Sequence, residues 1–174
     1  MEQLPPNSLA FIALVNEYCS NLEHAPSLER GTFVNSMAKL LPRIYISALD
    51  LPEPVLLGDV EIPPALDEEQ YDLVRARLAA LLGEDDVYLE VFMDDMKYSD
   101  SPIATSISEN LADLYQVFFD LLAAVRDLDA SVQQELLTRC REDFGSYWSQ
   151  TLCNVLRAIN NVAVNTHDDD DFLY

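Results

Sequence analysis

Apolar residues in the first third of the chain recur every three or four positions, the spacing of one buried helix face. This pattern predicts a helix over about 8–23 and a second over 29–49. The apolar face of the first helix comprises Leu9, Ile12, Val15, Cys19 and Leu22. Pro42 lies inside the second pattern, and proline removes a helical hydrogen bond. We therefore expect a bend or break near Ala38 to Leu41.

The middle of the chain has one clear helical pattern and one ambiguous segment. Asp67 is a typical N-cap residue and begins a helix expected over 67–82, which Gly83 is placed to end. Residues 86–96 fit two patterns, because Val87 and Leu89 alternate as in a strand whereas Tyr88 and Phe92 have the i, i+4 spacing of a helix. We interpret this segment as a short helix.

The last third contains the longest apolar patterns. One predicts a helix over 104–127 and the other a helix over 131–163. At 1.5 Å per residue the second would be roughly 48 Å long. Gly145 either breaks it or allows a neighbouring helix to approach closely.

Residues 51–64 contain four prolines and no regular period, which predicts a long loop. Several apolar residues in this loop favour a packed strap over a mobile functional segment. The fold expected is an all-α single-domain bundle of five to six mostly antiparallel helices over 1–166, crossed by the Pro-rich loop and followed by an acidic tail over 167–174.

Acidic residues outnumber basic ones by 31 to 10, giving a formal charge of −21, while 49% of the residues are hydrophobic. The apolar content excludes a chain that is disordered as a whole. The charge disfavours direct contact with nucleic acids or anionic membranes. Residues 50–100 hold fifteen acids and three bases, whereas residues 1–49 hold four and three. A basic partner is therefore expected to meet the central segment.

Enzyme motifs are absent from the sequence: there is no GxSxG, Walker A loop or GxGxxG, and only two histidines. The three cysteines show no ligand spacing and suit a reducing compartment. The amino-terminal segment lacks the positive charge of a secretory signal. We expect a cytoplasmic protein with no catalytic, cofactor or metal site, although whether it is an enzyme is left open.

Clustered carboxylates are the remaining candidate chemistry. The possible partner-binding acidic surface comprises Glu84, Asp85, Asp86, Asp94, Asp95, Glu109, Asp113 and Asp120. A solvated helix face explains the same pattern without a partner. The function predicted first is an acidic interaction module that binds a basic protein. The alternatives are a nucleic-acid mimic that inhibits a DNA-binding protein, and a carboxylate-based enzyme or binding protein that depends on divalent cations.

Three groups of short motifs resemble an uncharacterised bacterial family. They are Glu109-Asn110-Leu111-Ala112-Asp113-Leu114-Tyr115, then Phe144-Gly145-Ser146-Tyr147-Trp148 with Leu156-Arg157-Ala158-Ile159, and Phe11 to Leu22 followed by Leu40-Leu41-Pro42. This family is known as a domain of unknown function, number five-zero-six-three. The resemblance covers most of the chain and implies an all-helical bacterial protein with no assigned activity.

Overall fold

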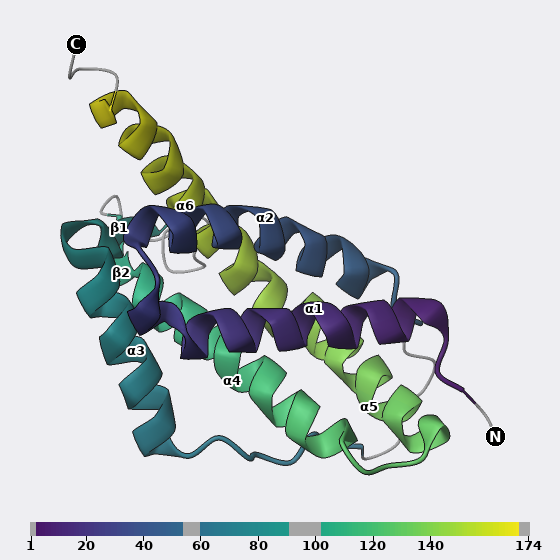
Figure 1. Ribbon diagram of the computed structural model, residues 1–174. Coiled ribbons are helices and arrows are strands. Elements are labelled where there is room, and N and C mark those ends of the chain that lie inside the picture. The colour runs from purple at the N-terminus through teal and green to yellow at the C-terminus, as the bar shows by residue number, and fades with distance from the viewer. Residues whose placement is uncertain (1–2, 54–59, 91–101, 171–174) are drawn as a thin grey trace.

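The computed structural model describes residues 3–53, 60–90 and 102–170, and side chains as far as residue 165. Within these ranges the helices form a bundle, which confirms the all-α class (Figure 1). The α-helices are α1 (Pro6–Glu23), α2 (Arg30–Leu49), α3 (Glu68–Leu82), α4 (Ile107–Val125), α5 (Ala130–Asp143) and α6 (Ser149–Asp170). The shorter elements are η1 (Ala25–Ser27), η2 (Gly83–Asp86), β1 (Val87–Glu90), β2 (Ile103–Ser106) and the π-helical η4 (Phe144–Trp148).

Helix α4 is the central element of the bundle, because it packs against α1, α3, α5 and α6. Helix α2 packs on α1 and α6 and covers another side. The chain passes from α1 to α2 through the single turn η1, so the two helices are neighbours, as their short connection predicts.

An aromatic cluster fills the centre of the core. Phe118 of α4 makes edge-to-face contacts with Tyr18 of α1 and Trp148 of η4, each with ring centroids 5.2 Å apart. Phe144 contacts Trp148 at 4.6 Å. The polar ends of the large rings are satisfied, since the Tyr18 hydroxyl donates to the Leu111 carbonyl and the Trp148 indole donates to the Cys140 carbonyl. Buried aromatic rings with satisfied polar groups are among the largest single contributions to a small core.

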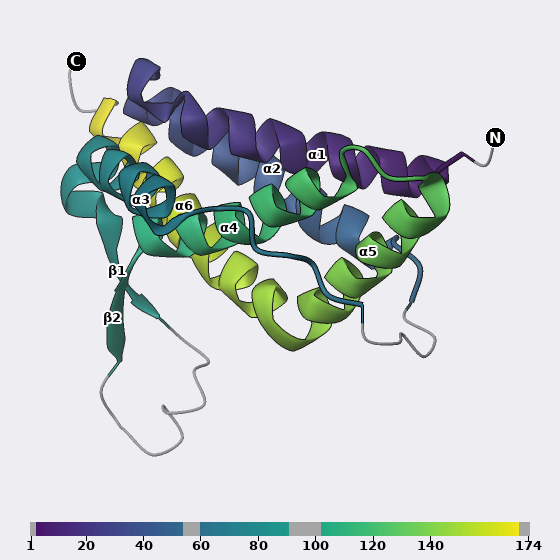
Figure 2. The same ribbon diagram turned by 90° about the horizontal axis from the view of Figure 1, so that it is seen from below.

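The long helix expected over 131–163 is divided at the position of Gly145. Five residues, Phe144–Trp148, form a π-helical turn between α5 and α6, and Figure 2 shows the two helices meeting there at an angle. The sequence allowed a break at Gly145, and the structure has one. Helix α6 then continues to Asp170, because no glycine or proline ends it earlier, and residues 167–170 of the expected tail have a helical backbone.

Helix α2 runs as one continuous element from Arg30 to Leu49 with Pro42 inside it. Of the bend or break expected near Ala38 to Leu41, the break is therefore wrong, and the bend stays a prediction. Both Leu41 and Ile44 are completely buried on either side of the proline. Tertiary packing of this face outweighs the hydrogen bond that proline removes.

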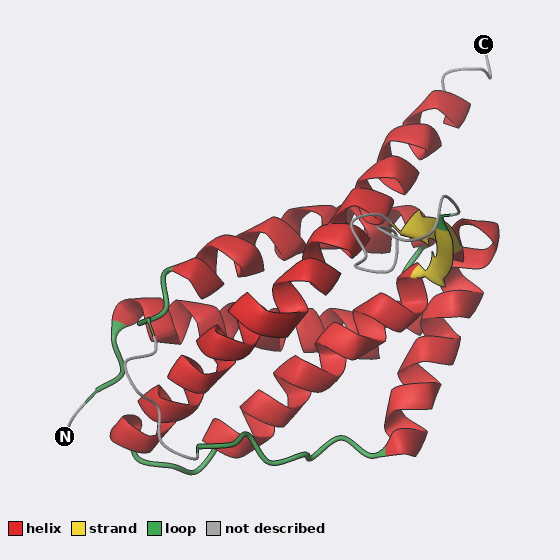
Figure 3. Cartoon of the chain, turned by 180° about the vertical axis from the view of Figure 1, so that it is seen from behind, coloured by secondary structure: helices red, strands yellow, loops and turns green. Residues whose placement is uncertain are grey.

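The short helix expected over 86–96 is wrong for residues 87–90, which form strand β1 antiparallel to β2 (Figure 3). Residues 91–96 lie outside the described residues. Pairing with β2 in the register Val87 to Ser106 and Glu90 to Ile103 accounts for the strand, because the alternating apolar residues Val87 and Leu89 are exposed. Pairing with a distant strand is invisible to local periodicity. The next helix accordingly begins at Ile107 rather than near residue 104.

The carboxyl-terminal part of the Pro-rich loop, residues 60–67, lies along α4 (Figure 2) and is called the strap below. Val60 and Ile62 are half-buried against the core, and Leu66 is buried. One carboxylate oxygen of Asp120 on α4 accepts hydrogen bonds from the backbone amides of Ala65 and Leu66, both at 2.8 Å. The middle of the loop, residues 54–59, lies outside the described residues, so the complete crossing loop stays a prediction.

The central position of Phe118 gives a stability test. We expect Phe118→Ala to lower the free energy of unfolding by about 3–5 kcal/mol, the usual cost of removing a buried aromatic ring. Urea denaturation followed by circular dichroism measures it. Leu9→Ala is the matched control, because Leu9 is 53% exposed and its truncation should cost less than about 1 kcal/mol. Equal losses for the two variants would contradict the assignment of Phe118 to the core centre.

Candidate functional site

The predicted acidic residues around η2 do not form one exposed surface. Glu84 is exposed, whereas Asp85 forms an ion pair with Arg30 at the start of α2. Asp86 is buried at 9% exposure. Asp94 and Asp95 lie outside the described residues, so their role stays a prediction.

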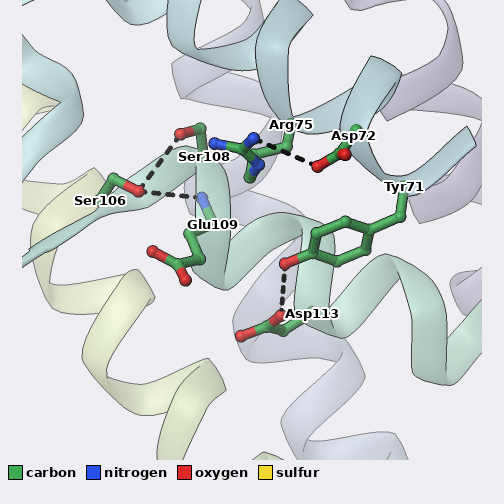
Figure 4. Close-up of polar contacts among 7 residues, drawn as sticks. All are labelled: Tyr71, Asp72, Arg75, Ser106, Ser108, Glu109 and Asp113. Carbon is green, nitrogen blue, oxygen red and sulfur yellow. Dashed lines mark hydrogen bonds and ion pairs between the residues drawn. The ribbon is translucent and has the colours of Figure 1, made fainter. Parts of the chain in front are cut away.

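Asp86 stabilises the start of α4. Its assignment to the exposed acidic surface is wrong, because the side chain is buried. Its two carboxylate oxygens accept hydrogen bonds from the backbone amide and the hydroxyl of Ser108, each at 2.7 Å. The Ser106 hydroxyl accepts from the Glu109 amide at 3.3 Å (Figure 4). Two of the first amides of the helix, which have no intrahelical acceptor, are thereby satisfied. A buried carboxylate with these contacts has little surface to offer a partner.

The acidic residues of α4 face the strap and α3. Asp113 is half-buried and accepts a hydrogen bond of 2.7 Å from the Tyr71 hydroxyl, which reaches it from α3 (Figure 4). Asp120, seven residues further along the same face, holds the strap amides. Glu109 is exposed at the first turn. Of the predicted acidic surface, Asp113 and Asp120 lie together with a further acid, Asp143, around one cavity.

A cavity of about 410 Å³ lies where the strap, α4, α5 and η4 meet, and is called the α4–α5 cavity. It is lined by Ile62, Asp113, Gln116, Val117, Asp120, Asp143 and Tyr147. Three carboxylates thus share one concavity with an amide, a phenol ring and two aliphatic side chains. Asp143 is paired with Arg139 at 2.9 Å. Tyr147 is 54% exposed, so its ring is accessible at the edge of the cavity.

A second cavity of about 380 Å³ adjoins the first and is called the α3–α4 cavity. Its lining comprises Leu66, Asp67, Glu68, Tyr71, Asp113 and Gln116. Asp113 and Gln116 line both cavities, so the two form one groove along α4, called the acidic groove below. Neither cavity has a lysine or arginine among its described lining residues.

Burial raises the pKa of Asp113 above its ordinary value, and the nearby carboxylates Glu109 and Glu90 raise it further. The hydrogen bond from Tyr71 acts in the opposite direction but does not cancel the effect. Burial also raises the pKa of Tyr147, with a further contribution from Asp113. The groove is therefore a region of negative potential in which Asp113 bears an energetic cost when ionised.

Among the described lining residues of the groove, Asp113 and Asp120 belong to the predicted acidic surface, whereas sequence reasoning missed the polar groups Asp67, Glu68, Tyr71, Gln116, Asp143 and Tyr147. Tyr71 lies in the helix expected over 67–82, and Asp143 and Tyr147 lie on either side of Gly145 in the helix expected over 131–163. Their meeting with α4 depends on the π-helical turn and on the packing of α3, which no local spacing reveals. The one available signal was the adjacency of an acid and an exposed aromatic residue near Gly145.

Neither a metal-binding cluster nor a membrane-spanning helix occurs in the part of the chain that the structure describes. The described residues contain no group of three or more His, Cys, Asp or Glu side chains arranged to hold a metal ion. No helix among them has both the length and the apolar composition of a membrane span.

The fold and the groove define an all-helical bundle with an acidic concavity beside its central helix. A family model described as "Domain of unknown function (DUF5063)" matches residues 2–165, and the chain belongs to this family. It is also similar to the crystal structure of protein BF1032 from Bacteroides fragilis. The two are 34% identical with a TM-score of 0.77 over 90% of this chain and 92% of that chain. No curated protein matches the sequence.

The role of Asp86 predicts a stability difference between neighbouring acids. We expect Asp86→Ala to lower the free energy of unfolding by about 1–3 kcal/mol, because it leaves a buried amide and hydroxyl of Ser108 without their acceptor. Asp85→Ala, which breaks a partly exposed ion pair, should cost less than about 1 kcal/mol. Chemical denaturation of both variants measures the difference. A larger loss for Asp85→Ala would contradict the capping role.

The raised pKa of Asp113 predicts a pH dependence of stability. The folded protein holds this proton more tightly than the unfolded chain, so stability falls as the pH rises from the ordinary Asp value and stops falling above the folded pKa. Asp113→Asn removes that cost, and its amide oxygen can still accept from Tyr71. We expect the stability advantage of the variant to grow as pH rises from about 4, the ordinary Asp value, and then to level off.

Thermal melting across this pH range measures the Asp113 effect. Glu135→Gln on α5, where the side chain is exposed, removes the same charge and serves as the control. A variant whose stability follows the wild type in parallel at every pH would show that the environment of Asp113 does not raise its pKa.

Proposed function

We propose that this protein is a non-enzymatic interaction module whose acidic groove receives basic side chains of a partner protein. The observation that carries the proposal is the α4–α5 cavity, in which three carboxylates converge and no lysine or arginine is among the described lining residues. Such a concavity attracts a lysine ammonium or an arginine guanidinium, and the carboxylates provide acceptors for its N–H donors.

The chemistry of the lining supports an organic cation. The exposed ring of Tyr147 provides an aromatic face, and aromatic faces attract ammonium and guanidinium groups. Ile62 and Val117 provide apolar walls for the aliphatic stem of a lysine or arginine side chain. Further along the strap, the backbone amides of Ala65 and Leu66 donate to Asp120, which attaches the strap to α4 beside the cavity.

The net charge supports the same kind of partner at longer range. At −21 the protein attracts a basic surface before contact and repels nucleic acids and anionic membranes. Binding is therefore expected to weaken as salt rises. A simple cation would only neutralise the carboxylates. A basic side chain of a protein partner would also fill the α4–α5 cavity.

A capped peptide with one lysine between glycines is the probe for this proposal. We expect the double variant Asp113→Asn, Asp143→Asn to bind it about tenfold more weakly for each carboxylate that contacts the ammonium. Isothermal titration calorimetry at low and at physiological salt measures the loss. The control, Asp127→Asn with Glu135→Gln, removes the same two charges from exposed positions outside both cavities.

Two results would overturn the proposal. One is equal weakening in the groove variant and in the control variant, which would make the acidic surface as a whole responsible. The other is the absence of measurable binding by the wild type to both the lysine peptide and its arginine counterpart.

A further inference from the structure

The two cavities divide the acidic groove into adjoining compartments. Each has acids of its own: Asp120 and Asp143 line the α4–α5 cavity, whereas Asp67 and Glu68 line the α3–α4 cavity. Asp113 belongs to both, and its carboxylate is held at their junction by the Tyr71 hydroxyl. The negative charge is thus distributed along the groove in two groups that share one carboxylate.

The dimensions of the compartments fit two separate side chains. Volumes of about 410 and 380 Å³ lie near the lower end of the range of roughly 300–1,000 Å³ that is usual for small-ligand sites. The two cavities share Asp113 and Gln116, so they adjoin along α4. In an extended segment, side chains on the same side recur about 7 Å apart, every second residue. Two basic side chains on one such segment can therefore enter neighbouring compartments.

The boundary of the groove also suits an extended chain. The strap residues Ile62 and Leu66 line the two cavities in turn, so the strap follows the groove over both compartments. The side chain of Asp120 already binds two consecutive backbone amides of this strap. The groove therefore runs beside a length of non-helical backbone that is attached to α4.

We propose that the acidic groove recognises an extended segment of a partner protein that carries two basic side chains with one residue between them, one in each cavity. This inference rests on the proposed function and specifies the partner's chemistry. The shared carboxylate of Asp113 faces both cations, and the compartment-specific acids place each of them. Spacing in the partner, and not its total charge alone, then determines affinity.

Three capped glycine peptides test the inference: one with a single lysine, one with two adjacent lysines, and one with two lysines separated by one glycine. The two-lysine peptides have equal charge, but adjacent side chains of an extended chain point to opposite sides. We expect the separated pair to bind the full chain at least about tenfold more tightly than either of the other peptides, measured by calorimetry.

Variants of the compartment-specific acids provide the matched test. Glu68→Gln and Asp143→Asn each remove one charge from a different cavity, and each should lower the affinity of the separated-pair peptide toward that of the single-lysine peptide. Glu135→Gln should leave it unchanged. Circular dichroism confirms that each variant is folded before binding is measured.

The outcomes separate this inference from the proposed function. Equal affinity for the adjacent and separated pairs would overturn two-compartment recognition, while the effect of Asp113→Asn with Asp143→Asn on the single-lysine peptide would still support the proposed function. Tighter binding of the linear triamine spermidine than of any peptide would also overturn it, because the occupant would then be a small polyamine. No binding by any peptide would overturn both.

Discussion

The contact between Phe118 and Trp148 is the interaction on which the other features of this structure depend. It joins the central helix α4 to the π-helical turn, and Tyr18 of α1 packs against the same Phe118 ring. Because α4 is fixed on this side by aromatic packing, its opposite side is available for Asp113 and Asp120. The position of Tyr147, the residue before Trp148, follows directly from the burial of its neighbour. Core packing therefore determines which side chains line the groove.

The second constraint is the attachment of the strap. Residues 60–67 have no regular secondary structure of their own, so their backbone amides need partners from elsewhere. Asp120 provides acceptors for two of them, and Leu66 buries its side chain. Pro63 and Pro64 restrict the backbone immediately before these amides. The strap is thus held near its end by a charged group of α4, and it contributes Ile62 to one cavity and Leu66 to the other.

The sequence was sufficient to predict the helical elements, because their apolar residues repeat over many turns. It was misleading where a contact distant in sequence decides the structure. Strand β1 depends on pairing with Ile103–Ser106, and the continuity of α2 through Pro42 depends on the packing of Leu41 and Ile44. The same limit applies to the site: charge identified Asp113 and Asp120, but nothing local distinguished them from Asp86, which is buried against Ser108.

The proposed function would account for the position of Asp113, which solubility alone does not explain. Solubility requires charges at exposed positions, where they cost little, as Glu84 and Glu109 illustrate. Asp113 instead lies half-buried beside Glu109 and Glu90, and burial raises its pKa. A carboxylate in this environment lowers the stability of the free protein when it ionises, and an incoming cation would relieve that cost. Under the proposed function a basic side chain of the partner would supply the missing interaction, while the hydrogen bond from Tyr71 holds the carboxylate in place.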